Sequence, residues 1–243
     1  MPLELGYNTN GLAHHRLVDA LQILAEIGYG TAAITIDHHC LDPYSPHIRD
    51  EVREVRGQLA ESNLCCVVET GARFLLDPRR KHHPSLLSTN DDDRQKRREF
   101  LCKAMEIAVD LEAEAVSFWS AAKDPALSDD DAWNILIEEC DDLLTQAVKY
   151  DLRLAFEPEP GMFIESIGQF RALRAAVGEG LLLALDVGHC YCTNDLPIGK
   201  VVEEFKGAIA TASLEDIRGG KHEHLLPGEG EINFSDVLRA FKA

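Results

Sequence analysis

The chain alternates short apolar runs with longer segments of helical periodicity, and this alternation constrains the fold more than any other feature. The apolar runs predict strands at residues 3–7, 31–37, 65–70, 115–120, 152–157, 181–186 and 210–216. The segments between and after them predict helices at about 17–28, 47–62, 91–112, 128–150, 166–177, 197–208 and 234–241. A strand followed each time by a helix is typical of a parallel sheet covered by helices.

The length and the continuity of the chain predict a single domain. The chain has 243 residues, within the range of one large α/β unit, and no stretch rich in Pro, Gly or Ser divides it. A closed barrel and an open doubly wound sheet share the observed alternation. Seven strand-helix units are more than a typical open sheet needs, and no eighth strand is evident after Phe241. The pattern therefore predicts one α/β domain over residues 1–243 and leaves open how its sheet closes.

The composition excludes several classes of partner. A net charge of −18 repels polyanions, so we expect no nucleic-acid partner. No apolar run reaches the roughly 18 residues that a membrane span needs, so we expect no membrane partner. The start, MPLELGYNTNG, lacks the basic and apolar blocks of a secretory signal, which favours the cytoplasm. Nothing in the composition decides the oligomeric state, and a homodimer is compatible with it.

The cysteines and the one basic run have ordinary structural interpretations. Seven cysteines at irregular spacing do not predict a disulfide framework. Cys190 and Cys192 form a C-x-C beside His189, but without a second cysteine cluster this is a weak zinc signal, and we favour a structural role. The basic run RRKHH at 79–83 is interpreted as a solvated loop, with phosphate binding as the alternative.

Acidic residues recur where the predicted strands end. They are Asp37, Glu69, Glu157 with Glu159, Asp186 with His189 three residues later, and the pair Glu215 and Asp216. Carboxylates gathered at the carboxyl ends of parallel strands repel one another unless a cation or a substrate compensates them. A divalent metal is the natural compensation. Capping of the following helices or a local salt bridge is the alternative, and for Asp37, Glu69 and Asp216 the two interpretations are evenly balanced.

Three motifs resemble one known family. They are FEPEPG at 156–161, ALDVGH at 184–189 and HEHLLPGEGEINF at 222–234. In this order and spacing the chain resembles the xylose isomerase-like TIM barrels, which comprise sugar and sugar-phosphate isomerases and epimerases, with the endonuclease IV group as a relative. The resemblance covers most of the chain. It implies that the sheet is a TIM-type (β/α) barrel whose eighth strand is not evident in the sequence.

The resemblance also implies roles for individual residues. In that family a strand-five Glu, a strand-six Asp, a strand-seven His and a strand-eight Glu hold one divalent metal. Glu157 resembles the first of these and Asp186 the second. His189 resembles the family's substrate-contacting histidine, and Arg218 resembles a substrate-binding arginine. The family's loop after strand seven is matched by His224 and Glu229.

The chain departs from the family pattern at two metal ligands. The position of the family's strand-seven histidine corresponds here to Ala212 or Ser213, neither of which carries an imidazole. The family's strand-eight glutamate has no counterpart in the sequence. Glu215, expected two residues beyond Ser213 on the same strand face, is our candidate to complete the set together with His224. His222 is the alternative from the same segment. The extra histidines of the three-zinc relatives are not evident.

These observations predict a divalent-metal-dependent isomerase or epimerase for a small sugar, sugar phosphate or related polyol, acting by proton transfer through an enediolate. The metal is Mn²⁺, Mg²⁺, Co²⁺ or Zn²⁺. Glu157 and His189 are the predicted catalytic residues. The predicted substrate contacts are Glu69, Arg73, Glu159 and Arg218. The alternatives are a dehydratase or lyase on the same scaffold and a barrel that has lost catalysis and acts as a binding protein.

Overall fold

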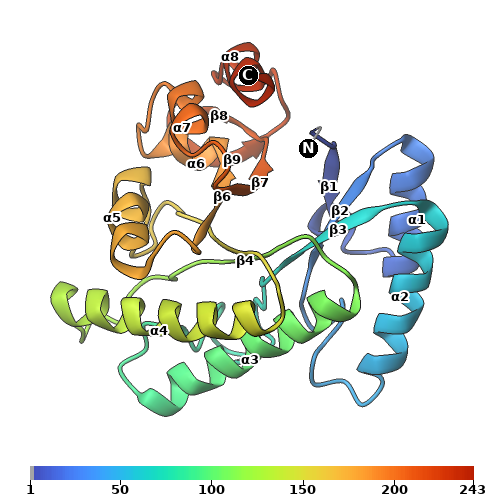
Figure 1. Ribbon diagram of the computed structural model, residues 1–243, viewed down its shortest axis with the longest axis horizontal. Helices are drawn as coiled ribbons and strands as arrows, with labels where there is room; N and C mark the ends of the chain where they lie inside the picture. Colours follow the sequence, from blue (N-terminus) through green and yellow to red (C-terminus); the bar gives the residue numbers. More distant parts are fainter. Residues whose placement is uncertain (1–2) are drawn as a thin grey trace. The chain divides into compact units, whose positions relative to one another are not determined.

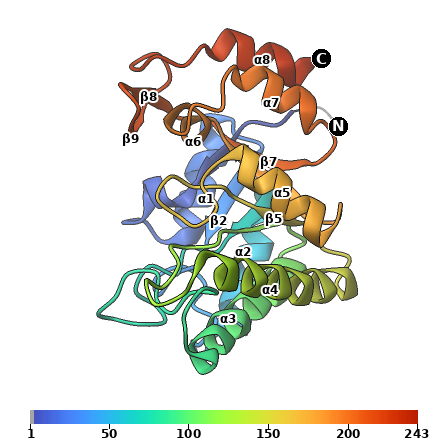
Figure 2. The ribbon, with the colours of Figure 1, turned by 90° about the vertical axis from the view of Figure 1, so that its left-hand side faces the viewer.

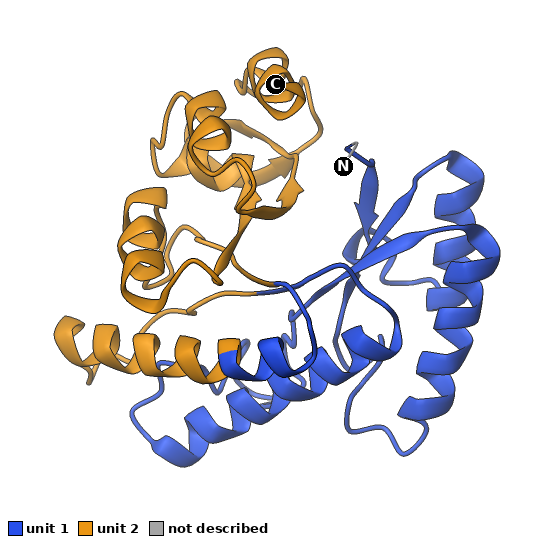
Figure 3. Ribbon diagram, viewed as in Figure 1, with its two compact units in different colours: residues 1–117, 145–153 blue, residues 118–144, 154–243 orange. Residues whose placement is uncertain are grey.

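The computed structural model describes residues 3–243 of the protein and contains two compact units. The first unit comprises residues 1–117 and 145–153, and the second comprises residues 118–144 and 154–243 (Figure 3). The prediction of a single domain remains a prediction. Both units are built from parallel strands that alternate with helices.

Parallel strands in the first unit pair in their order along the chain (Figure 1). In the pairing of β2 with β3, for example, Ala33 stands opposite Val67. Helices α1 and α2 contact each other beside these strands. The elements of this unit are β1 (Gly6–Asn8), η1 (Thr9–Leu12), α1 (Leu17–Ile27), β2 (Thr31–Thr35), α2 (Ile48–Ser62), β3 (Cys65–Glu69), α3 (Asp91–Asp110) and the first two residues of β4 (Val116–Phe118).

The second unit combines parallel strands with an antiparallel hairpin. Strand β6 lies between β5 and β7 and is parallel to both, whereas β8 and β9 pair with each other. Helices α7 and α8 lie side by side (Figure 2). The elements are α4 (Asp129–Lys149, to residue 144 in this unit), β5 (Leu154–Phe156), α5 (Ile167–Val177), β6 (Leu182–Asp186), α6 (Val187–Cys192), α7 (Ile198–Glu204), β7 (Ile209–Ser213), β8 (Asp216–Arg218), β9 (Lys221–Leu225) and α8 (Phe234–Lys242).

Local sequence signals explain where several helices begin. Helix α3 follows Asn90, whose side chain accepts the N–H of Asp92, and its first turn holds three aspartates at the positive end of the helix dipole. Helix α5 begins with a capping box in which Ser166 and Gln169 each accept a backbone N–H of the other. These caps match the predicted helix starts at about 91 and 166.

The core of the second unit contains a chain of contacting phenylalanines. Ring centroids lie 5.2 Å apart for Phe118 and Phe156, 6.1 Å for Phe156 and Phe170, and 5.5 Å for Phe170 and Phe205. These rings come from β4, β5, α5 and the end of α7, so they fasten helices to the ends of two strands. Phe118, Phe156 and Phe170 are each no more than 1% exposed. Their burial positions the end of β5, which Glu157 follows.

Most predicted elements are present, and the differences lie in the last third of the chain. The predicted strand at 210–216 ends at Ser213, so Glu215 does not lie on the same strand as Ser213. Asp216 instead begins β8, and the segment that we expected to be a loop forms the β8–β9 hairpin. The short helix α6, which directly follows β6, was also not predicted. Within residues 3–243 the parallel strands number seven, and none of the helices is long and apolar enough to cross a membrane.

Shortening Phe170 is expected to destabilise the second unit, because the ring is fully buried between two other phenylalanines. Phe170→Ala removes apolar contacts and leaves a cavity, so the free energy of unfolding should fall by about 3 to 5 kcal/mol. Urea titration followed by circular dichroism measures this change. Val148→Ala, at a side chain that is 77% exposed, is the control and should stay within about 0.5 kcal/mol of the unchanged protein.

Candidate metal and substrate site

Three polar side chains meet at the ends of β5 and β6. Glu157 directly follows β5, Asp186 ends β6, and His189 lies in the first turn of α6. One potential ligand atom from each lies within 4.8 Å of the others. Asp186 and His189 are 6% and 5% exposed, whereas the side chain of Glu157 is 27% exposed. Glu157 is therefore the member of this group that solvent and a substrate reach most readily.

Asp186 connects β6 to α6 by capping the helix. Its Oδ1 accepts the N–H of Gly188 at 2.7 Å and the N–H of His189 at 3.0 Å. These hydrogen bonds satisfy two N–H groups at the helix start and hold the carboxylate in one orientation. The helix therefore begins with no intervening loop, which places His189 next to the strand end.

The hydrogen bonds of His189 determine which ring nitrogen carries the proton. Nδ1 lies 2.9 Å from the carbonyl oxygen of Pro158, which can only accept, so Nδ1 donates a proton to it. Nε2 then presents its lone pair when the ring is neutral. Burial lowers the pKa of His189, which favours this neutral form, although the Pro158 carbonyl opposes the shift. His189 is thus oriented to accept a hydrogen bond or to bind a cation through Nε2.

A second group of side chains shares His189. The Nε2 atoms of His189 and His222 are 3.1 Å apart, and Nε2 of His222 is 3.7 Å from Oε1 of Glu215. Nδ1 of His224 contacts Oε2 of Glu215. Burial is the main cause that lowers the pKa of His222. His189, Glu215 and His222 each offer one ligand atom within 4.8 Å of the others.

Gly188 explains how Glu215 comes so close to α6. A Cβ at position 188 would stand 2.3 Å from Oε1 of Glu215 and 2.7 Å from its Cγ. Any larger residue would displace this side chain, so the glycine of the ALDVGH motif is required by a close approach.

Asp216 anchors the loop that carries the PGEG motif. The side chain is 1% exposed, and its two oxygens accept four backbone N–H groups. The donors are Ile217 at 2.9 Å, Gly228 at 2.8 Å, Gly230 at 2.8 Å and Ile232 at 3.0 Å. Burial opposes the charge of Asp216, but these hydrogen bonds outweigh it and lower its pKa. Asp216 therefore has a local structural role in this loop, although it caps no helix as the sequence had suggested.

Replacing Asp216 by Asn is expected to loosen this loop. The amide group would direct N–H donors at backbone N–H groups, and we expect a loss of about 2 to 4 kcal/mol of stability at neutral pH. Because the pKa of Asp216 is lowered, the unchanged protein loses this stabilisation only as the pH falls below the ordinary value of 3.8. Urea titration at pH 7 measures the difference. Asp142→Asn, on the exposed face of α4, is the control that should change little.

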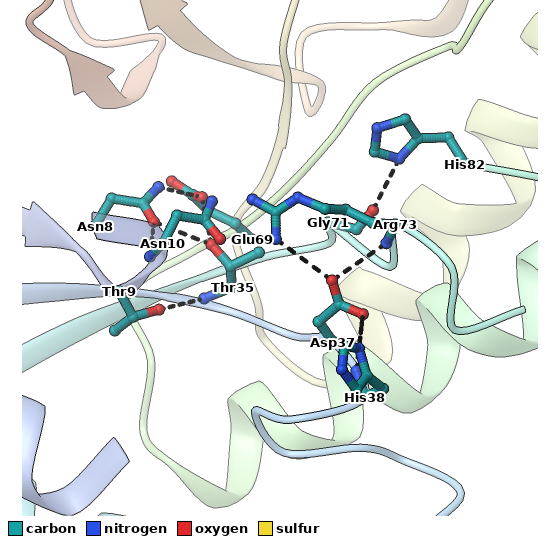
Figure 4. A network of polar contacts seen from close by, with 10 residues as sticks. All are labelled: Asn8, Thr9, Asn10, Thr35, Asp37, His38, Glu69, Gly71, Arg73 and His82. Carbon is teal, nitrogen blue, oxygen red and sulfur yellow. Dashed lines mark hydrogen bonds and ion pairs between the residues drawn. The ribbon is translucent and has the colours of Figure 1, made fainter. Parts of the chain in front are cut away.

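The first unit holds a separate polar network at the ends of β1, β2 and β3 (Figure 4). Glu69 accepts hydrogen bonds from Nδ2 of Asn8 at 2.6 Å and from Oγ1 of Thr35 at 2.9 Å. Burial raises the pKa of Glu69, and these two hydrogen bonds partly offset the effect. Asp37 accepts the N–H of His38 at 2.8 Å and pairs with Nη1 of Arg73 at 3.5 Å.

The network assigns local partners to two of the predicted strand-end acids. Asp37, His38 and His39 also offer ligand atoms within 4.8 Å of one another. The guanidinium of Arg73 already compensates the charge of Asp37, so this group is a poorer cation site than those in the second unit. Asp37 thus forms the local salt bridge that the sequence left open, whereas Glu69 is held by neutral side chains.

His82 is expected to make the stability of the first unit depend on pH. Its Nδ1 lies 3.1 Å from the carbonyl oxygen of Gly71 (Figure 4), and burial, assisted by the charge of Lys81, lowers its pKa to about 4. The unfolded chain binds a proton at an ordinary pKa near 6.5, whereas the folded chain does not until the pH is much lower. Stability should therefore be constant above about pH 7 and fall as the pH decreases from 6.5 to 4.

His82→Asn keeps a side-chain donor for Gly71 but cannot take up a proton. Comparing urea titrations at pH 7 and pH 4, we expect the variant to lose about 1 to 2 kcal/mol less than the unchanged protein, an amount reduced for the partial exposure of the ring. His47→Asn, at an exposed position, should keep the original pH dependence. If all three proteins lost the same free energy of unfolding between pH 7 and pH 4, the role of His82 would be contradicted.

The remaining predicted site residues make the following contacts. Arg73 and Glu69 belong to the network of the first unit. Glu159 donates its backbone N–H to Ile164 in the loop after β5, and Arg218 at the end of β8 contacts the carbonyl of Glu229. Of the four predicted metal ligands, Glu157 and Asp186 group with His189, whereas Glu215 groups with His189 and His222 and contacts His224. Their assignment as metal and substrate ligands stays a prediction.

Comparison with known protein families shows to which family this chain belongs. The xylose isomerase-like TIM barrel family matches residues 21–243, and this chain belongs to that family. The resemblance and the TIM-type fold predicted from the sequence are both confirmed. No curated protein sequence matches the chain.

Solved structures of similar fold cover nearly the whole chain. A D-tagatose 3-epimerase-like protein is 18% identical with a TM-score of 0.78, covering 99% of this chain and 86% of that protein. The 3-keto-D-glucoside 4-epimerase of E. coli is 11% identical with a TM-score of 0.78, covering 99% and 88%. An AP endonuclease of family 2 from Brucella melitensis is 15% identical with a TM-score of 0.74, also covering 99% and 88%. At these identities the likeness establishes the fold.

Proposed function

We propose that this protein is a divalent-metal-dependent isomerase or epimerase acting on a small sugar, sugar phosphate or related polyol. The observation that carries the proposal is the convergence of Glu157, Asp186 and His189 at the ends of β5 and β6. Two of the similar structures are named for sugar epimerases, which is consistent with a polyhydroxylated substrate. The same family includes an AP endonuclease-like fold, but the charge of −18 disfavours a nucleic-acid substrate.

The chain's own residues fit a divalent cation. Glu157 and Asp186 supply carboxylate oxygens, and the half-buried Glu215 has a buried oxygen, Oε1, with no hydrogen-bond partner among residues 3–243. Such an oxygen is costly to bury unless a cation or a donor compensates it. A bound divalent ion would polarise a substrate carbonyl and stabilise negative charge on its oxygen. We propose that Glu157 and Asp186 hold this ion, together with ligands from the segment that contains Glu215 and His224.

The proton transfer is assigned to Glu157. Its carboxylate is the more exposed member of the group, and its Oε1 lies 3.7 Å from Nδ1 of His189. A carboxylate in this position can remove a proton from a carbon next to a carbonyl and return it to the neighbouring carbon or to the other face. His189, whose Nδ1 is engaged by Pro158, offers Nε2 to the bound ligand.

A binding protein without catalysis is the second candidate, because one observation favours it. Ala212 and Ser213 end β7 where the resemblance predicts a metal-binding histidine. Neither a methyl group nor a hydroxyl can replace an imidazole as a ligand for a divalent transition metal. This candidate predicts a folded protein that binds a sugar and exchanges no carbon-bound hydrogen.

Exchange of substrate hydrogen with solvent separates the two candidates. In D₂O with Mn²⁺ or Co²⁺, we expect a panel of ketoses and their phosphates to include one that gains deuterium next to its carbonyl, detected by NMR. Glu157→Gln should lower this exchange at least about a hundredfold, because the amide cannot accept the proton. Glu179→Gln, at an exposed turn, should leave it unchanged.

Three outcomes of this assay are informative. Loss of water from a substrate, instead of isomerisation, would identify the dehydratase or lyase alternative on the same scaffold. Sugar binding without exchange would support the binding protein. Full exchange by Glu157→Gln would rule out the proton transfer proposed for this residue.

A further inference from the structure

We propose that Asp37, His38 and His39 form a metal site in the first unit, weaker than the one proposed for the second unit, which binds one divalent ion that accepts imidazole ligands, Zn²⁺ or Co²⁺. The three residues are consecutive, lie just after β2 and belong to the first unit. The inference goes beyond the proposed function, because it requires neither the reaction nor any ligand of the second unit.

The first support is the backbone turn that carries the two imidazoles. The N–H of Asp37 donates to the carbonyl of Cys40 at 3.0 Å, and the N–H of Cys40 donates to the carbonyl of Asp37 at 3.0 Å. These paired hydrogen bonds leave His38 and His39 as the two residues at the tip of a tight turn. Their ring centroids lie 4.7 Å apart. The closed turn therefore holds two potential ligands side by side.

The second support is the buried carboxylate at the base of this turn (Figure 4). The side chain of Asp37 is 2% exposed, its Oδ1 accepts the N–H of His38 at 2.8 Å, and its Oδ2 accepts the N–H of Arg73 at 3.3 Å. The guanidinium of Arg73 also contacts Oδ2, at 3.5 Å. Oδ1 is thus the oxygen that faces an imidazole, and its direction is fixed before an ion binds, which lowers the entropic cost of binding.

The third support is the separation of the ligand atoms. Oδ1 of Asp37 and Nδ1 of His38 are 3.2 Å apart, and one ligand atom from each of the three residues lies within 4.8 Å of the others. Two ligand atoms that bind one tetrahedral ion at about 2.0 to 2.1 Å stand about 3.3 Å from each other. A proton on Nδ1 joins Asp37 and His38 as a hydrogen bond, and a divalent ion can replace this proton with little movement of either side chain.

The imidazole side of this group is open to solvent. The side chain of His38 is 68% exposed, and His39 is exposed as well. The net charge of −18 raises the concentration of cations near the surface of the chain. An ion can therefore reach the two imidazoles and complete its coordination with water.

The ligand set determines which ions bind and how tightly. Two imidazoles and one carboxylate suit Zn²⁺ and Co²⁺, whereas Mg²⁺ and Mn²⁺ favour sites that are richer in oxygen. The positive charge of Arg73 reduces the attraction of Asp37 for any cation. The site is for this reason the weaker of the two, and a single chain should show two classes of Zn²⁺ binding.

Metal titration of the full-length, chelator-stripped protein tests the inference without any substrate. In calorimetry we expect Zn²⁺ to bind at two sites of different affinity. His38→Gln and His39→Gln should each weaken the weaker site at least about tenfold and leave the other unchanged. His47→Gln, at an exposed histidine of the same unit, is the matched control and should bind as the unchanged protein does. Equal titrations for His38→Gln, His39→Gln and the unchanged protein would overturn the proposal.

A cysteine variant tests whether residue 39 contacts the ion. His39→Cys replaces one metal ligand by another, so Co²⁺ should give a thiolate-to-metal charge-transfer band in the near ultraviolet in addition to any absorption of the unchanged protein. His47→Cys should add no such band. Its absence from folded His39→Cys, as judged by circular dichroism, would also contradict the site.

Arg73→Gln tests the part of the carboxylate. The substitution removes the positive charge beside Asp37, so Zn²⁺ should bind the weaker site at least about threefold more tightly. Equal or weaker binding by the folded variant would show that Asp37 does not hold the ion.

The number of bound ions separates this inference from the proposed function. If the unchanged protein binds one Zn²⁺ and His39→Gln binds none, the inference holds and the metal proposed for the second unit is absent. If both proteins bind one Zn²⁺ and Asp186→Asn binds none, the inference fails and the metal of the proposed function stands.

Discussion

The hydrogen bonds from two backbone N–H groups to Asp186 are the interaction on which the site in the second unit depends. They end β6 and begin α6 at the same residue, so His189 lies against the end of β5 and reaches the carbonyl of Pro158. Without the cap, a loop would separate the strand from the helix and the imidazole would have no fixed direction. Because α6 begins directly after β6, the side chains of Asp186 and His189 lie together at the end of the strand.

Two buried carboxylates of the second unit are stabilised by backbone N–H groups. Asp186 and Asp216 accept six N–H groups between them, two and four respectively. Backbone donors fix a carboxylate in place without occupying the surrounding space with a long cationic side chain. In the first unit Asp37 also accepts backbone N–H groups, but it pairs in addition with the guanidinium of Arg73. This contrast explains why the second unit is the better candidate for binding a cation.

Periodicity was sufficient to predict the strands up to β6, because each is a short apolar run between helices with clear caps such as Ser166. It failed after Ser213, where KHEHL carries polar residues on every exposed position of β9. A turn signal was nevertheless present, since Gly219 and Gly220 both have positive φ, at 60° and 66°, as a tight two-residue hairpin turn requires. The grouping of His222 with His189 could not be predicted, because it depends on the hairpin folding back over α6. The sequence showed Gly188 only as part of the ALDVGH motif. The close approach of Glu215 in the structure explains why a glycine is needed there.

The four N–H groups that Asp216 accepts also change how the PGEG segment behaves over time. A surface loop normally exchanges its amide hydrogens with water rapidly, since its N–H groups point outward. Here the amides of Gly228, Gly230 and Ile232 point inward at a buried anion. They share its protection, so this loop opens as one cooperative piece with β8 and not residue by residue. The segment that follows β9 is therefore held rigidly, although it has no regular secondary structure.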